Sequence, residues 1–159
     1  MERKITGYHL DDYNDWVAEL DCYHSQHVRN NPPFINRPWV ETEEGRMSRL
    51  GQILNCVRCD RLEMPEGLTA YTRTPSYNKN TIPVELKKTH AAKSGIWGII
   101  HVLEGSLIYT VKSAATQQYE LKHGERGIIV PDMPHQLETN GSVSFYLEYL
   151  TKNVSIVSS

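Results

Sequence analysis

Two histidines and a glutamate in the second half of the chain belong to the residue types that bind an exchangeable metal. His90 precedes a long apolar stretch, His135 follows the turn at residues 131–134, and Glu148 lies late in an aromatic strand. Two imidazoles and one carboxylate leave positions on a metal open for water, dioxygen or a substrate oxygen. We therefore predict an open metal site formed by His90, His135 and Glu148. This ligand set suits zinc, iron(II), nickel and manganese alike.

The first half of the chain holds all three cysteines, close to a histidine. One residue separates Cys22 from His24, and two residues separate Cys56 from Cys59. A Cys-x-x-Cys pair can bind one tetrahedral ion with both thiolates, and a Cys-x-His pair can do so from a turn. We predict a closed zinc site with these four ligands, and His27 is the alternative imidazole. A redox-active Cys-x-x-Cys and three inert buried thiols are the competing interpretations.

Other polar residues of the apolar strands have weaker claims to a site. His101 alternates with Trp97 and Leu103, so we interpret it mainly as a packed histidine and secondarily as a metal ligand. Tyr109 and Tyr146 are candidates for a catalytic base only because of their strand location.

Composition and charge restrict the classes of partner. The net charge of −2 and the scattered Lys and Arg residues argue against a nucleic-acid surface. No signal-peptide pattern follows Met1, and the longest apolar run, residues 95–100, is too short to cross a bilayer, so we expect no membrane partner. Three cysteines cannot all form disulfides, and metal-binding thiolates are typical of a reducing compartment. We therefore expect a cytoplasmic protein whose partner is a small molecule or an anion.

The first region, residues 1–64, is expected to be a small α+β domain. Residues 5–10 and 16–20 flank a turn-rich segment and predict a hairpin. Thr42 is expected to cap a short helix that runs to Leu50. So small a region cannot bury a sufficient core by itself, and a structural metal would supply the missing stability.

The second region, residues 65–152, shows short strands separated by turns, and a tail of residues 153–159 follows it. Glu104-Gly105 and Asn140-Gly141 are expected to form tight turns between strands. Many short strands with regular turns predict a β-sandwich or barrel. The expected strands cover residues 71–73, 95–103, 106–111, 118–121, 127–130, 135–138 and 142–150.

Four segments of this second region, residues 89–98, 102–107, 131–135 and 145–149, together resemble the cupin family. More narrowly, they are similar to the TehB-like/YeaR-like cupins, which are associated with tellurite resistance and related to nitrate-responsive proteins. The resemblance runs from about residue 69 to residue 150. It implies a mainly β fold of the cupin type, a double-stranded β-helix or jelly roll.

The first region resembles a small bacterial domain of unknown function that often precedes such a cupin. It shares a Cys-x-His element, a motif like Arg37-Pro38-Trp39-Val40 and a closing Cys-x-x-Cys. The resemblance implies a zinc-ribbon-like α+β domain.

Two departures from the cupin pattern limit what the resemblance implies. General cupins carry a His-x-His pair and a glutamate in their first motif, whereas this chain has His90 alone, with Trp97-Gly98 near the glutamate position. The methyltransferase domain of full-length TehB proteins has no counterpart in this sequence. Chemistry that depends on S-adenosylmethionine is therefore not expected.

Our leading expectation is a metal-binding cupin protein that binds a small anion or metabolite in a stress response. The setting of tellurite or nitrogen-oxide exposure comes from the resemblance alone, because a fold does not assign chemistry. The alternative is a metal-dependent cupin enzyme, such as a dioxygenase or an isomerase. A third interpretation makes the first region an adaptor with Phe34 and Trp39 exposed, although these aromatics suit its small core better. Cupins often pair through sheet edges, so a homodimer is the default expectation.

Overall fold

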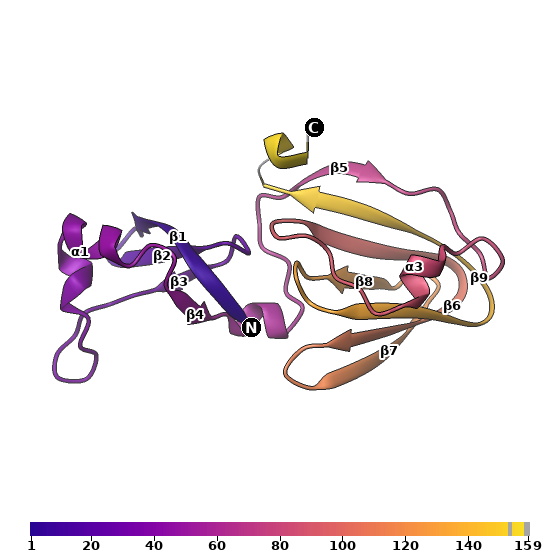
Figure 1. Cartoon of the computed structure of the whole chain (residues 1–159), viewed down its shortest axis with the longest axis horizontal. Coiled ribbons are helices and arrows are strands. Elements are labelled where there is room, and N and C mark those ends of the chain that lie inside the picture. The colour runs from indigo at the N-terminus through magenta and orange to yellow at the C-terminus, as the bar shows by residue number, and fades with distance from the viewer. Residues whose placement is uncertain (153, 158–159) are drawn as a thin grey trace. The chain divides into compact units, whose positions relative to one another are not determined.

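The computed structural model describes residues 1–152 and 154–157 of the chain. They form two compact units, Met1–Arg58 and Cys59–Ser159, and each is built around an antiparallel sheet (Figure 1). The predicted mainly β fold class is confirmed. Residues 153, 158 and 159 of the expected tail lie outside the described part, and Val154–Val157 form the short 3-10 helix η2. No helix among the described residues is long and apolar enough to cross a membrane.

The first unit contains a four-stranded sheet. Its strand order is β3-β2-β1-β4, with β1 at Glu2–Leu10, β2 at Trp16–Leu20, β3 at Ser25–His27 and β4 at Ile53–Asn55. The predicted hairpin of β1 and β2 is confirmed. Asp11 closes its turn, because one carboxylate oxygen accepts hydrogen bonds of 2.9 Å from the backbone N–H groups of Tyr13 and Asp15.

Two short helices, η1 at Pro38–Glu41 and α1 at Glu43–Ser48, connect β3 to β4. A third, α2 at Val57–Asp60, follows β4. Thr42 caps α1 as predicted, since its Oγ1 accepts a hydrogen bond of 3.0 Å from Gly45 N–H. Trp39 lies edge-on to Tyr8 with 6.3 Å between ring centroids, whereas Phe34 is 86% exposed. Of these two aromatics, only Trp39 contributes to packing.

The second unit is a rolled sheet dominated by two long strands. Its strand order is β5-β9-β6-β7, and β8 also pairs with β6. Strands β6 and β9 run side by side over most of their length (Figure 1). The bounds are β5 Thr69–Arg73, α3 Val84–Lys87, β6 Trp97–Lys112, β7 Thr116–Lys122, β8 Arg126–Ile129 and β9 His135–Thr151. Buried side chains of β6, β8 and β9 fill the roll: Ile100, Leu107, Tyr109, Ile129, Leu137, Phe145 and Leu147.

Two of the predicted turns are wrong. Glu104-Gly105 lies within β6 and Asn140-Gly141 lies within β9, so the expected short strands on either side of them merge into two long ones. Glycine beside a polar residue favours a tight turn, but it equally permits a bulge in a continuous strand.

The register of β6 and β9 shows the bulge directly. Gly105 pairs with Val143 and Leu107 pairs with Thr139, so three residues of β9 lie opposite one residue of β6. Gly105 has a φ of +72°, and a Cβ on it would lie 1.9 Å from the carbonyl oxygen of Ser142. Glycine is therefore required at this close approach of the two strands.

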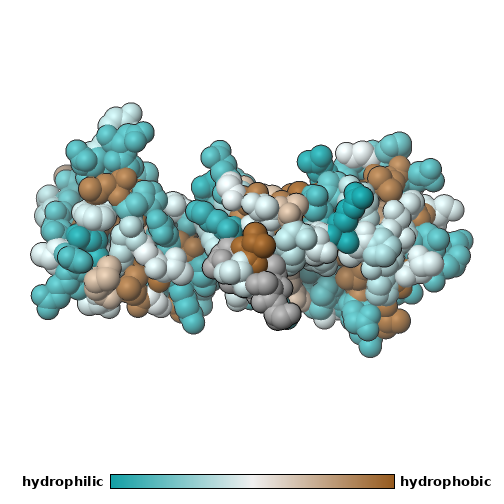
Figure 2. All heavy atoms as spheres, turned by 90° about the horizontal axis from the view of Figure 1, so that it is seen from above, coloured by the Kyte–Doolittle hydropathy of each residue, from teal (hydrophilic) through white to brown (hydrophobic). Residues whose placement is uncertain are grey.

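Exposed hydrophobic side chains are dispersed over both units. On the face shown in Figure 2 they form small groups among hydrophilic residues rather than one broad patch. Isolated exposed apolar residues of this kind are normal for a folded protein surface. The polar clusters and cavities of the chain, rather than an apolar patch, are therefore its candidate functional features.

Candidate metal and ligand sites

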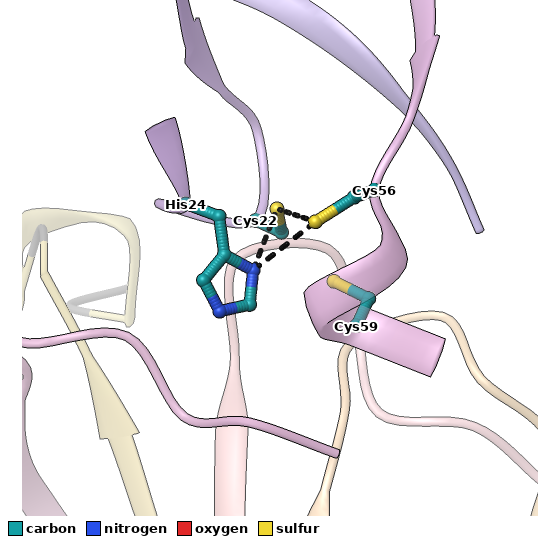
Figure 3. A group of neighbouring side chains, drawn as sticks. All are labelled: Cys22, His24, Cys56 and Cys59. Carbon is teal, nitrogen blue, oxygen red and sulfur yellow. Dashed lines mark hydrogen bonds between the residues drawn. The ribbon is translucent and has the colours of Figure 1, made fainter. Parts of the chain in front are cut away.

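The turn between β2 and β3 presents Cys22 and His24 to the same buried space. Leu20 N–H donates to the His24 carbonyl over 3.0 Å, and Tyr23 N–H donates to the Leu20 carbonyl over 2.9 Å. Tyr23 adopts a φ of +74°, the left-handed conformation. The chain therefore reverses between Cys22 and His24, and both side chains reach one cluster (Figure 3).

Cys56 and Cys59 come from the start of α2. Cys56 follows β4, and its N–H donates to the Met1 carbonyl over 2.7 Å, which holds this backbone against β1. Cys59 lies three residues further on, within α2. One helical turn therefore sets the position of the second thiol relative to the first, although the division into two compact units falls inside this helix.

The four side chains have the spacing of a tetrahedral metal site. The Sγ atoms of Cys22 and Cys56 are 3.8 Å apart, and Nδ1 of His24 lies 3.4 and 3.3 Å from them (Figure 3). With Cys59, all four ligand atoms lie within 4.8 Å of one another. Zinc bonds of about 2.3 Å to sulfur and about 2.0 Å to nitrogen imply edges of roughly 3.8 Å (S–S) and roughly 3.5 Å (S–N). The donor set and its spacing thus fit zinc.

This cluster is closed to solvent. Cys22 and Cys59 are 0% exposed, His24 is 1% exposed and Cys56 is 4% exposed. A tetrahedral ion with four protein ligands has no open position, so such a site is structural. His27 lies outside the cluster: its side chain is 49% exposed, and its Nε2 lies 2.8 Å from Oδ2 of Asp11. The imidazole that the structure brings to the three thiols is that of His24.

The structure also brings His90 and His135 together. They form a backbone bridge with hydrogen bonds of 3.0 and 2.8 Å, and their ring centroids are 4.3 Å apart. In both rings Nδ1 faces a carbonyl two residues earlier, Lys88 at 3.0 Å and Met133 at 3.2 Å. A carbonyl only accepts, so we assign the proton of each neutral ring to Nδ1 and a lone pair to Nε2. Metal-binding histidines are commonly oriented in this way.

Glu148 does not join these two histidines, so the expected triad is corrected to a pair. Tyr149 lines the same cavity as His135, and adjacent residues of a strand face opposite sides of the sheet. Glu148 instead lies on the outer face, where its Oε1 is 3.3 Å from Nε2 of His101. His135 and Glu148 are 13 positions apart on one continuous strand, as 148 minus 135 gives, so alternation alone places them on opposite faces. The turn expected at Asn140-Gly141 concealed this, because it divided β9 into two strands.

A cavity of about 600 Å³ opens beside the histidine pair. Burial raises the pKa of Tyr71 and of Tyr149, so both hydroxyls remain protonated at neutral pH. The cavity thus combines two lone-pair nitrogens with hydroxyl donors. Its lining comprises Tyr71, His90, Ala91, Ala92, Lys93, Ser94, Ile96, Ile129, His135 and Tyr149.

Burial also lowers the pKa of His135, from 6.5 to about 4, and the neighbouring His90 lowers it further while the bond to Met133 opposes the shift. Protonation therefore favours the unfolded chain. The contribution of His135 to the unfolding free energy is constant above pH 6.5 and decreases as pH falls toward 4. We expect an NMR titration of the His135 ring to give a midpoint near 4, and a midpoint near 6.5 would show that the ring is solvated.

Neither tyrosine considered as a base is suited to that role. Tyr109 is buried, its hydroxyl donates to the Ile128 carbonyl over 2.7 Å, and burial raises its pKa. Tyr146 stacks on His101 with 4.6 Å between centroids on the outer face. His101 is therefore a packed residue, as its alternation predicted, and it has a carboxylate partner that the sequence pattern did not reveal.

Comparison with known proteins finds one family-model match in each half of the chain. Residues 6–63 match the family described as "Protein of unknown function (DUF3565)", and residues 72–147 match the TehB-like domain family. A search of the curated proteins found no match.

One solved structure shares its fold with part of this chain. An Escherichia coli K12 protein, solved as a structural genomics target, has a TM-score of 0.52 at 21% identity, over 57% of this chain and 97% of its own. TehB from Haemophilus influenzae has a TM-score of 0.48 at 22% identity, over 55% of this chain, and the match spans 32% of that protein. At these identities the likeness concerns the fold alone. The chain is thus similar to the DUF3565 family over residues 6–63 and to the TehB-like domain family over residues 72–147.

Proposed function

We propose that this is a metal-binding protein in which a zinc-stabilised N-terminal domain precedes a cupin that binds a small anion or metabolite. The observation that carries the proposal is the buried Cys22/His24/Cys56/Cys59 cluster, whose spacing fits a tetrahedral ion. Thiolates and one imidazole favour zinc over harder ions. Because the ion has no open coordination position, its role is to hold together β2, β3 and α2.

The ligand-binding role of the cupin is supported by the cavity beside His90 and His135. Their Nε2 lone pairs can bind a divalent metal, for which zinc, iron(II), nickel and manganese are the candidates. Two protein ligands leave most of the coordination sphere to water or to a bound molecule, and the protonated Tyr71 and Tyr149 can donate hydrogen bonds to an anion there. Binding is favoured over catalysis because Tyr109 and Tyr146 cannot serve as a base in this cavity.

The biological setting is proposed from the family match and from the cysteines. The TehB-like match supports a stress response of the tellurite or nitrogen-oxide type. Three cysteines that form no disulfide and would serve as metal ligands suit a reducing cytoplasm. The edge strand β7 could pair two copies of the cupin into a homodimer.

Elemental analysis of the untagged protein and of a His135→Ala variant tests the two sites together. We expect two metal equivalents per chain in the wild type. The His135→Ala variant should lose only the metal of the open site, because His135 provides half of the protein ligands there. That metal is recognised as the one that is not zinc or, if both are zinc, as the more weakly bound one. His101→Ala is the matched control, since it removes a barrel histidine outside the cavity and should retain both equivalents. A single zinc in all three proteins would contradict the cupin metal site while leaving the N-terminal site intact.

A further inference from the structure

A second polar cluster occupies the outer face of the rolled sheet, away from the side on which His135 lies. Tyr146 stands on β9 between β6 and β5. His101 of β6 stacks on its ring at an interplanar angle of 15°, and the Arg73 guanidinium of β5 lies 5.8 Å from its centroid. Three strands thus bring a cation, an imidazole and an aromatic ring together.

A cavity of about 360 Å³ adjoins this cluster and is lined by Arg73, Thr74, Pro75, Ser76, Leu103 and Tyr146. Thr74 is fully engaged: its hydroxyl donates to the Pro75 carbonyl over 2.9 Å and accepts from Leu147 N–H over 3.0 Å. Among residues 1–152 and 154–157, none hydrogen-bonds the Arg73 guanidinium, the Ser76 hydroxyl or the Tyr146 hydroxyl. The side-chain polar groups still available to a ligand can therefore all donate, and one of them is cationic.

The nearby carboxylate is already engaged. Glu148 is the cross-strand neighbour of Arg73, yet its Oε1 contacts Nε2 of His101 at 3.3 Å and no ion pair joins it to Arg73. The guanidinium consequently keeps its hydrogen-bonding edge for a ligand. A planar guanidinium binds two oxygens of a carboxylate or phosphate at once, and hydroxyl donors add further hydrogen bonds to the same group.

We propose that this outer-face cavity binds a small oxyanion, a phosphate or carboxylate group, with Arg73 as its principal ligand and Ser76 and Tyr146 as supporting donors. The site is distinct from the cavity beside His90 and His135 and does not require a metal. It can be occupied whether or not the cupin metal site exists.

The test is an NMR titration of the isotopically labelled full chain with inorganic phosphate, and separately with acetate. We expect saturable shifts of the backbone amides of residues 73, 74, 76, 103 and 146 with at least one of these anions. The anion that binds more tightly identifies the preferred group. An Arg73→Gln variant should weaken binding at least about tenfold, because it removes the charge-assisted hydrogen bonds.

Two further variants separate a specific site from general charge attraction. Lys122→Gln removes an exposed cation of the same unit, on β7, and should leave the affinity unchanged. Glu148→Gln removes the negative charge next to Arg73 and should tighten binding. The proposal is overturned if neither anion gives saturable shifts, if the shifts centre on the His90 and His135 cavity, or if Arg73→Gln and Lys122→Gln weaken binding equally.

Discussion

A Cys56→Ala variant is expected to lose the N-terminal zinc and, with it, the folded state of residues 1–58, while the second unit stays folded. Cys56 supplies one of four ligands, and a tetrahedral structural site seldom retains its ion with three. Binding of structural zinc contributes about 10–16 kcal/mol to the folding of small zinc domains, which exceeds the total stability of most small units. Metal content and the NMR spectrum of the purified variant measure both consequences at once.

His27→Ala is the matched control for this prediction. His27 is the nearest alternative imidazole in the sequence, but it contacts Asp11 at the surface and lies outside the thiol cluster. The variant should keep its zinc and its fold. If Cys56→Ala instead folds normally and the wild type contains no zinc, the three cysteines are inert core residues and the N-terminal metal site is refuted.

Metal chelation provides an independent check on the same point. The Cys56→Ala variant also removes a buried thiol, so part of any loss of stability could come from packing. A strong chelator leaves every side chain in place, and it should unfold residues 1–58 of the wild type reversibly. Refolding upon return of zinc would assign the stability to the ion.

The Cys/His cluster could be predicted from the sequence because each half of it is local. Cys22-x-His24 and Cys56-x-x-Cys59 each place two ligands close together by their short spacing. The prediction then required only that the two motifs bind the same ion. The choice between His24 and His27 was left open by the sequence, and burial decides it: His24 is inside the cluster and His27 is half exposed.

The open site was less predictable because its members are far apart in the chain. His90 and His135 meet through a bridge whose partners are 45 positions apart, as 135 minus 90 gives. Glu148 faces away from His135 because side chains alternate without interruption along β9, whose buried residues from His135 to Leu147 all have odd numbers. The turn expected at residues 140–141 concealed this continuity. Residue types indicated candidate ligands, but the strand register decided which of them share a face.

A Gly105→Ala substitution is expected to lower the stability of the second unit by about 3 kcal/mol or more. The left-handed φ of +72° costs a non-glycine residue about 1–2 kcal/mol. The added Cβ would also lie 1.9 Å from the carbonyl oxygen of Ser142, so β6 and β9 would have to separate. Crowding of a packed interior typically adds about 1–3 kcal/mol. Hydrogen exchange of the slowest β6 and β9 amides measures the loss.

Gly124→Ala separates the two causes. Gly124 lies in the turn between β7 and β8 with a φ of +82°, and nothing lies within 4 Å of an added Cβ. This variant carries only the backbone cost, about 1–2 kcal/mol. Equal losses at the two positions would mean that the strands do not approach closely at Gly105, and the two turns expected from the sequence would regain support. A clearly larger loss at Gly105 would instead show that β6 and β9 approach each other closely at this bulge, as one continuous pair of strands requires.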